Sequence, residues 1–178
     1  QNYLKIKQIT LAWNKRGLTN PMHIGTNSKK LDISSEINTK KVSEEFSEFL
    51  KPGHLVCLFG DLGVGKTTFI KYLINNLQKK YKERISEVSS PTFNILNEYK
   101  IKKLNILHYD LYRVKDIREL DNLGILEGVN NNITLIEWPE IIINNLKDHI
   151  ALNFKYENNF NKRSITISST QKNILNAF

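Results

Sequence analysis

A run of glycines followed by a lysine and a threonine is the part of this sequence best suited to chemistry. Residues 60–67 read Gly-Asp-Leu-Gly-Val-Gly-Lys-Thr, which matches G-x-x-x-x-G-K-[ST], the phosphate-binding loop of P-loop proteins. Glycines let successive backbone N–H groups converge on phosphate oxygens. Lys66 adds a positive charge, and the Thr67 hydroxyl can ligate Mg²⁺. The sequence therefore predicts that a nucleoside triphosphate binds here together with Mg²⁺.

Such a loop needs a buried strand before it and a helix after it. Residues 54–59 form an apolar run of strand length, and residues 68–80 carry apolar side chains at helical spacing. The helix would present its positive N-terminal end to the same phosphates. The flanking elements therefore fit the loop.

Two carboxylates end strand-like segments and are candidates to hold Mg²⁺ or to position the attacking water. Asp110 follows the segment 104–109, and Glu137 follows the segment 133–136. A solvated strand end is the ordinary explanation for either carboxylate alone. Two such carboxylates in a chain that also has a phosphate loop favour a role in binding Mg²⁺ or in hydrolysis. The sequence leaves open which of the two touches the metal.

The segment Ser-Pro-Thr-Phe at residues 90–93 lies between the phosphate loop and Asp110. Pro91 favours an extended or turn conformation there. Thr92 is therefore a candidate sensor of the γ-phosphate or its Mg²⁺, as in switch segments. A capping or turn role is the alternative for this threonine.

Composition indicates one globular domain. The chain has 178 residues, of which 40% are hydrophobic and 25% are charged. No apolar run approaches the roughly 20 residues that a membrane-spanning helix needs, so we expect no membrane association. The formal charge of +8 suits an acidic partner such as RNA, although AT-rich coding DNA produces the same excess of lysine. Cys57 is the single cysteine, so no intramolecular disulfide can form, and we expect it in the core.

Periodicity and punctuation predict the remaining elements. We expect strands at 31–34, 93–99, 104–109, 133–136, 150–156 and 164–168, a helix from the cap Ser35 to Leu50, and a short helix at 116–123 stopped by Gly124. These elements indicate a three-layer α/β domain of P-loop NTPase type, with a mostly parallel sheet and an added antiparallel hairpin.

We place this domain at residues 31–170, between a basic extension at 1–30 and a tail at 171–178. The extension contains Lys and Arg but no Asp or Glu. We expect a bacterial-type cytoplasmic protein, because a phosphate loop and a single cysteine suit a reducing compartment. An organellar targeting role for the extension is the alternative.

Four motifs, taken in order, carry a family resemblance: G-D-L-G-V-G-K-T-T-F, S-P-T-F, H-Y-D-L-Y-R and E-W-P-E. With them the chain resembles the TsaE family, the small P-loop ATPases of bacterial tRNA threonylcarbamoyladenosine synthesis, over roughly residues 31–169. The departures are small, with Val64 where alanine is common and Tyr109 where phenylalanine is frequent. Neither departure removes a charged or nucleophilic group.

The resemblance implies ATP and Mg²⁺ as cofactors and assigns the site by position. It implies catalytic roles for Lys66, Asp110 and Glu137, and metal contacts from Thr67 with Glu137 or Asp110. It makes Thr92 the switch-like threonine. The residues that would wrap the triphosphate are Asp61, Leu62, Gly63, Val64, Gly65, Lys66, Thr67 and Thr68. Tyr112, Arg113 and Trp138 also match the motifs, with structural roles as the alternative.

The resemblance also implies the partners. Family members act with the threonylcarbamoyltransferase and its paralogous non-catalytic partner, and their ATP hydrolysis supports turnover of the complex that modifies the adenosine next to the anticodon of ANN-decoding tRNAs. Transfer happens on the partner, so hydrolysis by the isolated chain is expected to be weak. Direct contact with tRNA stays open.

Three other functions compete with this interpretation. A small-molecule P-loop kinase would close an arginine-bearing lid over the phosphates, but the arginines here are scattered: Arg16, Arg84, Arg113, Arg118 and Arg163. A non-hydrolysing nucleotide- and tRNA-binding module remains an alternative. A regulatory GTPase needs N-K-x-D, whereas residues 145–148 read Asn-Leu-Lys-Asp, so we exclude it.

Overall fold

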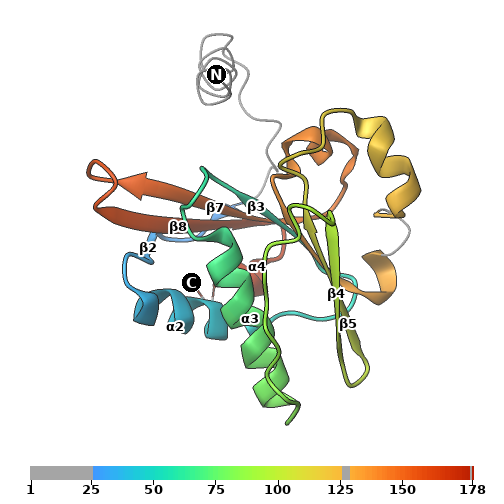
Figure 1. Cartoon of the computed structure of the whole chain (residues 1–178). Helices are drawn as coiled ribbons and strands as arrows, with labels where there is room; N and C mark the ends of the chain where they lie inside the picture. The colour runs from blue at the N-terminus through green and yellow to red at the C-terminus, as the bar shows by residue number, and fades with distance from the viewer. Residues whose placement is uncertain (1–25, 126–128, 177) are drawn as a thin grey trace.

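The computed structural model describes residues 26–125, 129–176 and 178 (Figure 1). Within these residues one sheet of eight strands has the order β1-β8-β7-β3-β6-β5-β4, and β2 also pairs with β8. The strands are β1 (Thr26–Asn27), β2 (Leu31–Asp32), β3 (Leu55–Phe59), β4 (Leu96–Ile101), β5 (Leu104–Asp110), β6 (Ile133–Glu137), β7 (Ile150–Glu157) and β8 (Lys162–Ser169).

The centre of this sheet is parallel and its edges are antiparallel. Strand β3 pairs in parallel with β6 and β7, and β5 pairs in parallel with β6. Antiparallel hairpins β4–β5 and β7–β8 flank this centre. The predicted P-loop type of α/β fold is confirmed, with antiparallel pairing at both edges where one hairpin was expected. Because the carboxyl ends of parallel strands meet at one edge, the residues that follow β3, β5 and β6 gather there.

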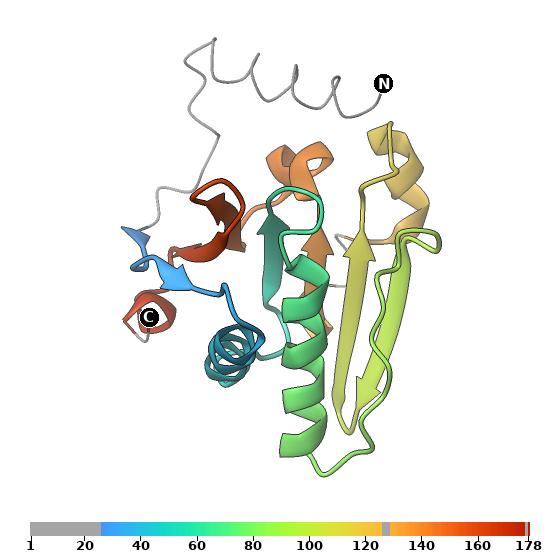
Figure 2. The ribbon, with the colours of Figure 1, turned by 60° about the vertical axis from the view of Figure 1, so that its left-hand side comes forward.

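Two helices cover one face of the sheet (Figure 2). Helix α2 (Glu36–Ser47) begins as predicted at Ser35, whose hydroxyl accepts a hydrogen bond from the Asn38 N–H at 3.1 Å. It ends before the predicted limit of Leu50. Helix α3 (Lys66–Lys80) begins two residues earlier than predicted, directly after Gly65. Its buried side chains pack on alternate residues of the central strands.

The opposite face is covered by four short 3-10 segments: η1 (Ile117–Leu123), η2 (Val129–Asn131), η3 (Pro139–Ile141) and η4 (Ile143–Asn145). The helix predicted at 116–123 is therefore a 3-10 turn. It still begins at a capping Asp116 and ends at Gly124, which has φ of 57°. Cys57 is fully buried on this face, as expected, and burial raises the pKa of its thiol.

The packed structure extends past both limits predicted for the domain. Strand β1 pairs with β8 before residue 31, and helix α4 (Lys172–Leu175) follows residue 170. Ile174 is fully buried, and the Phe178 ring lies 6.1 Å from the Phe46 ring. The predicted tail is thus part of the core. Residues 1–25 of the predicted extension lie outside the described residues.

Strand β4 begins at Leu96 where the sequence indicated residue 93, because a turn occupies the intervening residues. The Ile95 N–H donates to the Pro91 carbonyl at 2.6 Å within this turn. In the part of the chain that the structure describes, no helix is long and apolar enough to cross a membrane.

The C-terminal packing can be tested with Ile174→Ala. Loss of a fully buried isoleucine side chain should lower the free energy of unfolding by about 2–5 kcal/mol. The exposed neighbour Asn176→Ala is the control and should change it by less than about 0.5 kcal/mol. Urea denaturation measures both. Equal effects would show that α4 does not belong to the core.

Candidate functional site

The phosphate loop connects β3 to α3 through backbone conformations that suit glycine. Gly60, directly after β3, has φ of 136°, and Gly65, directly before α3, has φ of 114°. A Cβ atom on Gly60 would lie 2.6 Å from the carbonyl oxygen of Phe154 in the neighbouring strand β7. Gly60 therefore permits close packing of the loop on the sheet, whereas Gly65, with open space around its Cβ position, permits the turn into the helix.

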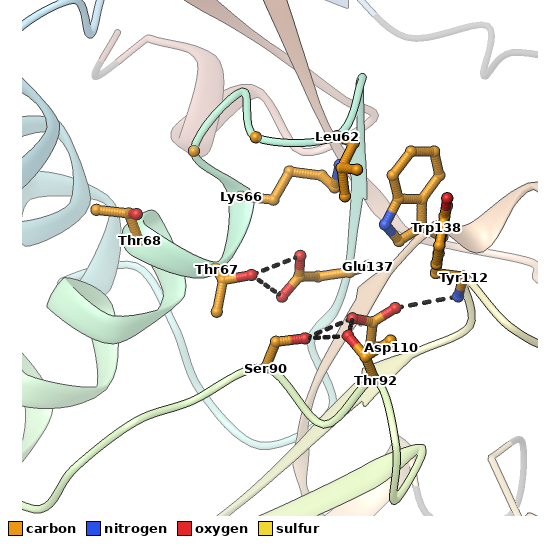
Figure 3. Close-up of a pocket in the computed structure, with 12 residues that line it drawn as sticks. Leu62, Lys66, Thr67, Thr68, Ser90, Thr92, Asp110, Tyr112, Glu137 and Trp138 are labelled. Atoms are coloured by element: carbon orange, nitrogen blue, oxygen red, sulfur yellow. Dashed lines mark hydrogen bonds between the residues drawn. The ribbon is translucent and has the colours of Figure 1, made fainter. Parts of the chain in front are cut away.

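A cavity of about 300 Å³ opens beside this loop (Figure 3). It lies at the carboxyl ends of the parallel strands, where the four sequence segments singled out for chemistry meet. Its lining residues are Leu62, Gly63, Gly65, Lys66, Thr67, Thr68, Ser90, Thr92, Asp110, Tyr112, Glu137 and Trp138.

Lys66 lies at the inner wall of the cavity and is only 4% exposed. Its Nζ donates to the carbonyl oxygens of Gly60 at 2.6 Å and Asp61 at 3.0 Å. The same atom lies 3.9 Å from the centre of the Trp138 ring. Burial lowers the pKa of the ammonium, and nearby carboxylates, Glu137 first among them, oppose this shift. A cation held in this way can neutralise an anionic ligand.

Thr67 and Glu137 are in direct contact in the wall of the cavity. The Thr67 hydroxyl lies 2.9 Å from Oε1 and 3.0 Å from Oε2 of Glu137. The strand register brings Glu137 close to the loop, because Glu137 at the end of β6 pairs with Leu58, two residues before the loop begins at Gly60. The carboxylate is therefore buried and aimed at the loop threonine.

Asp110 is the neighbour of Glu137 in the sheet register and is held by a different set of donors. Its Oδ2 accepts hydrogen bonds from the hydroxyls of Ser90 at 2.5 Å and Thr92 at 2.6 Å. Its Oδ1 accepts from the Tyr112 N–H at 3.0 Å. The predicted switch-like threonine and the predicted strand-end aspartate thus lie in direct contact.

Most residues that the sequence predicted for the site line this cavity: Leu62, Gly63, Gly65, Lys66, Thr67, Thr68, Thr92, Asp110 and Glu137. Val64 instead lines a neighbouring cavity, and its side chain is fully buried in the core. Asp61 lines a separate open cavity with Tyr156 and Phe160, and contributes its carbonyl to Lys66. The Tyr112 and Trp138 rings are in contact, with ring centres 4.8 Å apart and planes tilted by 50°. Arg113 lies over the exposed ring of Phe93.

Sequence reasoning missed the roles of Ser90 and His108. Ser90 donates to Asp110, and the Nε2 atom of His108 lies 2.9 Å from Oε1 of Glu137. A signal for His108 was present, because side chains two residues apart in a strand point to the same face. His108 precedes Asp110 by two residues in β5.

The donor set suits a hard cation. Thr67, Asp110 and Glu137 offer hydroxyl and carboxylate oxygens, which are the ligands that Mg²⁺ prefers. Among the described residues, no group of three or more His, Cys, Asp or Glu side chains gathers to hold a metal by itself. Magnesium commonly completes its coordination with water and phosphate oxygens. The residues present therefore fit a Mg²⁺ ion that arrives with a nucleotide.

Comparison with known proteins decides the family. The model of the family described as "Threonylcarbamoyl adenosine biosynthesis protein TsaE" matches residues 33–165. The chain belongs to the TsaE family. This confirms the resemblance carried by the four motifs, all of which lie within the matched residues.

Individual relatives agree with this assignment. The tRNA threonylcarbamoyladenosine biosynthesis protein TsaE of Rickettsia prowazekii is 43% identical over 136 residues, which cover 76% of this chain and 91% of the relative. The TsaE protein of Aquifex aeolicus is 42% identical over 112 residues, covering 63% and 77%. A crystal structure of Bacillus subtilis YdiB matches with a TM-score of 0.66 at 25% identity, covering 88% and 94%. The TsaE family takes part in tRNA threonylcarbamoyladenosine biosynthesis, as the names of its members state.

The two loop glycines provide a matched test of the loop geometry. Gly60→Ala and Gly65→Ala both place a side chain at positive φ, which costs about 1–3 kcal/mol. Gly60→Ala also forces a contact with the β7 backbone, so its free energy of unfolding should fall by a further ~1–3 kcal/mol. Chemical denaturation measures the difference. Equal losses would contradict the close approach of Phe154.

Proposed function

We propose that this chain binds Mg-ATP and hydrolyses it to support turnover of the tRNA threonylcarbamoyltransferase complex. The observation that carries the proposal is the convergence of Thr67, Glu137 and Asp110 beside a phosphate loop in one cavity. An oxygen-only donor set next to a buried lysine suits a metal-bound triphosphate. The choice of ATP and of the complex follows from membership of the TsaE family.

The loop and the start of α3 would bind the phosphates through backbone N–H groups and the Lys66 ammonium. A second cavity, of about 340 Å³, lies against the same turn and shares Gly65 and Thr68 with the first. Its lining includes Glu36, Tyr72 and Arg163. We assign the nucleoside end of the ligand to this second cavity, because it continues directly from the phosphate loop.

The contacts of the two carboxylates support different proposed roles for them. Both oxygens of Glu137 lie within 3.0 Å of the Thr67 hydroxyl, which supports a role in which Glu137 shares a metal ion with this threonine. Asp110 is instead bonded to Ser90, Thr92 and the Tyr112 N–H, and so positions the segment that carries Thr92. Bound Mg²⁺ would supply charge neutralisation at the phosphates.

The partners are proposed on the same family grounds. The threonylcarbamoyltransferase and its paralogous partner would carry the transfer step, and this chain would drive their cycle. A kinase receives less support, because the residues lining the 300 Å³ cavity include no arginine in the described part of the chain. A non-hydrolysing module would bind ATP without releasing phosphate even when the partners are present.

The role of the loop lysine can be tested with Lys66→Ala. Loss of the buried ammonium should abolish ATP-dependent stimulation of tRNA modification by the reconstituted transferase pair. Lys79→Ala, on the exposed side of the same helix, is the control and should retain it. Circular dichroism checks that both variants fold. Complementation of a strain lacking this activity by Lys66→Ala would show the proposed function to be wrong.

The division between the carboxylates can be tested with Glu137→Gln and Asp110→Asn. Glu137→Gln should lower phosphate release in the presence of the partners by about 100-fold, with a smaller effect on metal-free nucleotide binding. Asp110→Asn should alter the Mg²⁺ concentration required for half-maximal activity less than Glu137→Gln does. Steady-state phosphate release over a Mg²⁺ series measures both. If Asp110→Asn shifts the required Mg²⁺ concentration more than Glu137→Gln does, the metal contact belongs to Asp110 instead.

A further inference from the structure

His108 is a fully buried histidine in β5, and its hydrogen bonding is one-sided. Its Nε2 atom lies 2.9 Å from Oε1 of Glu137, while its Nδ1 atom has no hydrogen-bond partner among the described residues. On the same face of β5, Ile106 precedes it and Asp110 follows it. The imidazole therefore lies between the apolar core under α3 and the carboxylates of the cavity.

The direction of this hydrogen bond follows from the chemistry of its acceptor. An ionised carboxylate can only accept hydrogen bonds. An ionised Glu137 accepts from the Thr67 hydroxyl and, by the same rule, from Nε2 of His108, which then carries the shared hydrogen. Glu137 is thus held by two donors from different elements, with Thr67 on α3 and His108 on β5.

The simplest alternative is that His108 only fills space in the core. An apolar side chain would fill the same position without burying an unpaired ring nitrogen, whose desolvation is unfavourable. The residue before it on this face, Ile106, and its register partner in β6, Leu135, are apolar. Its register partner in β4 is Asn97, whose side-chain amide donates to the Ser89 carbonyl. The one interaction that an apolar residue could not supply is the hydrogen bond to Glu137.

We infer that His108 is a positioning residue for Glu137, which it holds in the orientation that meets the metal of a bound nucleotide. The inference rests on the proposed Mg-nucleotide site and adds to it a residue that touches neither metal nor phosphate. Hydrogen-bond partners that orient a ligating carboxylate typically contribute 10–100-fold to metal affinity. His108 would act through Glu137 alone.

Three substitutions separate the hydrogen bond from the shape of the ring. In His108→Gln the amide nitrogen lies the same number of bonds from Cβ as Nε2, so the donor to Glu137 is retained. In His108→Asn the amide nitrogen corresponds to Nδ1 and cannot reach Oε1. His108→Leu removes the donor and keeps an apolar side chain of similar bulk.

The experiment measures ADP binding to the purified full chain, first in EDTA and then over a Mg²⁺ series. For His108→Leu and His108→Asn, the Mg²⁺ concentration that half-restores tight binding should rise about 10–100-fold. Their affinity for ADP in EDTA should stay at the wild-type value. His108→Gln should follow the wild type under both conditions.

A second buried histidine offers the control. His54, directly before β3 and therefore at the opposite end of the sheet, is 5% exposed, and both of its ring nitrogens lack partners among the described residues. His54→Leu should leave the Mg²⁺ dependence unchanged. In a Glu137→Gln background, His108→Leu should cause no further rise in the Mg²⁺ concentration that half-restores ADP binding, because the two residues act through one contact.

Each outcome is decisive. The positioning role of His108 is overturned, while the Mg-nucleotide site stands, if His108→Leu, His108→Asn and His108→Gln all show the same Mg²⁺ dependence. The same conclusion follows if His54→Leu raises the required Mg²⁺ concentration as much as His108→Leu does. If the wild-type chain gains no ADP affinity from Mg²⁺, the proposed function is overturned and this inference with it. If His108→Leu fails to fold, the contrast between His108→Gln and His108→Asn decides the question.

Discussion

A buried carboxylate at the end of β6 is the constraint on which the site depends. Glu137 is 2% exposed, and an ionised group removed from water must find donors or positive charge nearby. The structure provides the Thr67 hydroxyl, the His108 imidazole and the neighbouring Lys66 ammonium. Two of these groups, Thr67 and Lys66, belong to α3 and the third belongs to β5, so the contacts of Glu137 link the start of α3 and the end of β5 to β6.

The parallel centre of the sheet makes this convergence possible. Strands β3, β6 and β5 end side by side, which places the start of the phosphate loop, Glu137 and Asp110 at one edge. The two faces of the sheet are packed differently. Helix α3 buries one face and presents its first turn to the cavity, while short 3-10 segments cover the other. The cavity therefore lies where the first turn of α3 meets the carboxyl ends of the parallel strands.

Much of the fold and of the site could be predicted from local patterns. The loop, α3, the strand ends at Asp110 and Glu137, and the cap at Ser35 each depend on residues close in sequence. The docking of Ile174 against the core could not be predicted in this way, because it depends on packing against residues far away in the sequence. The 3-10 form of η1 and the turn before β4 were missed although their hydrogen bonds are local, at Asp116 and between the Ile95 N–H and the Pro91 carbonyl. The sequence also pointed to the Ser90–Thr92 segment without revealing that both hydroxyls bind Asp110.

The amino-acid sequence by itself determined the kind of chemistry, because glycine spacing, a lysine, a threonine and two strand-end carboxylates are properties of residue type and order. It also determined the family, through four ordered motifs that lie within residues 33–165. Only the tertiary structure decided which donors meet which carboxylate. Thr67 and Glu137 are 70 positions apart, and His108 and Glu137 are 29 apart. Contacts over such separations are set by strand order and register, which bring together side chains that no local pattern relates.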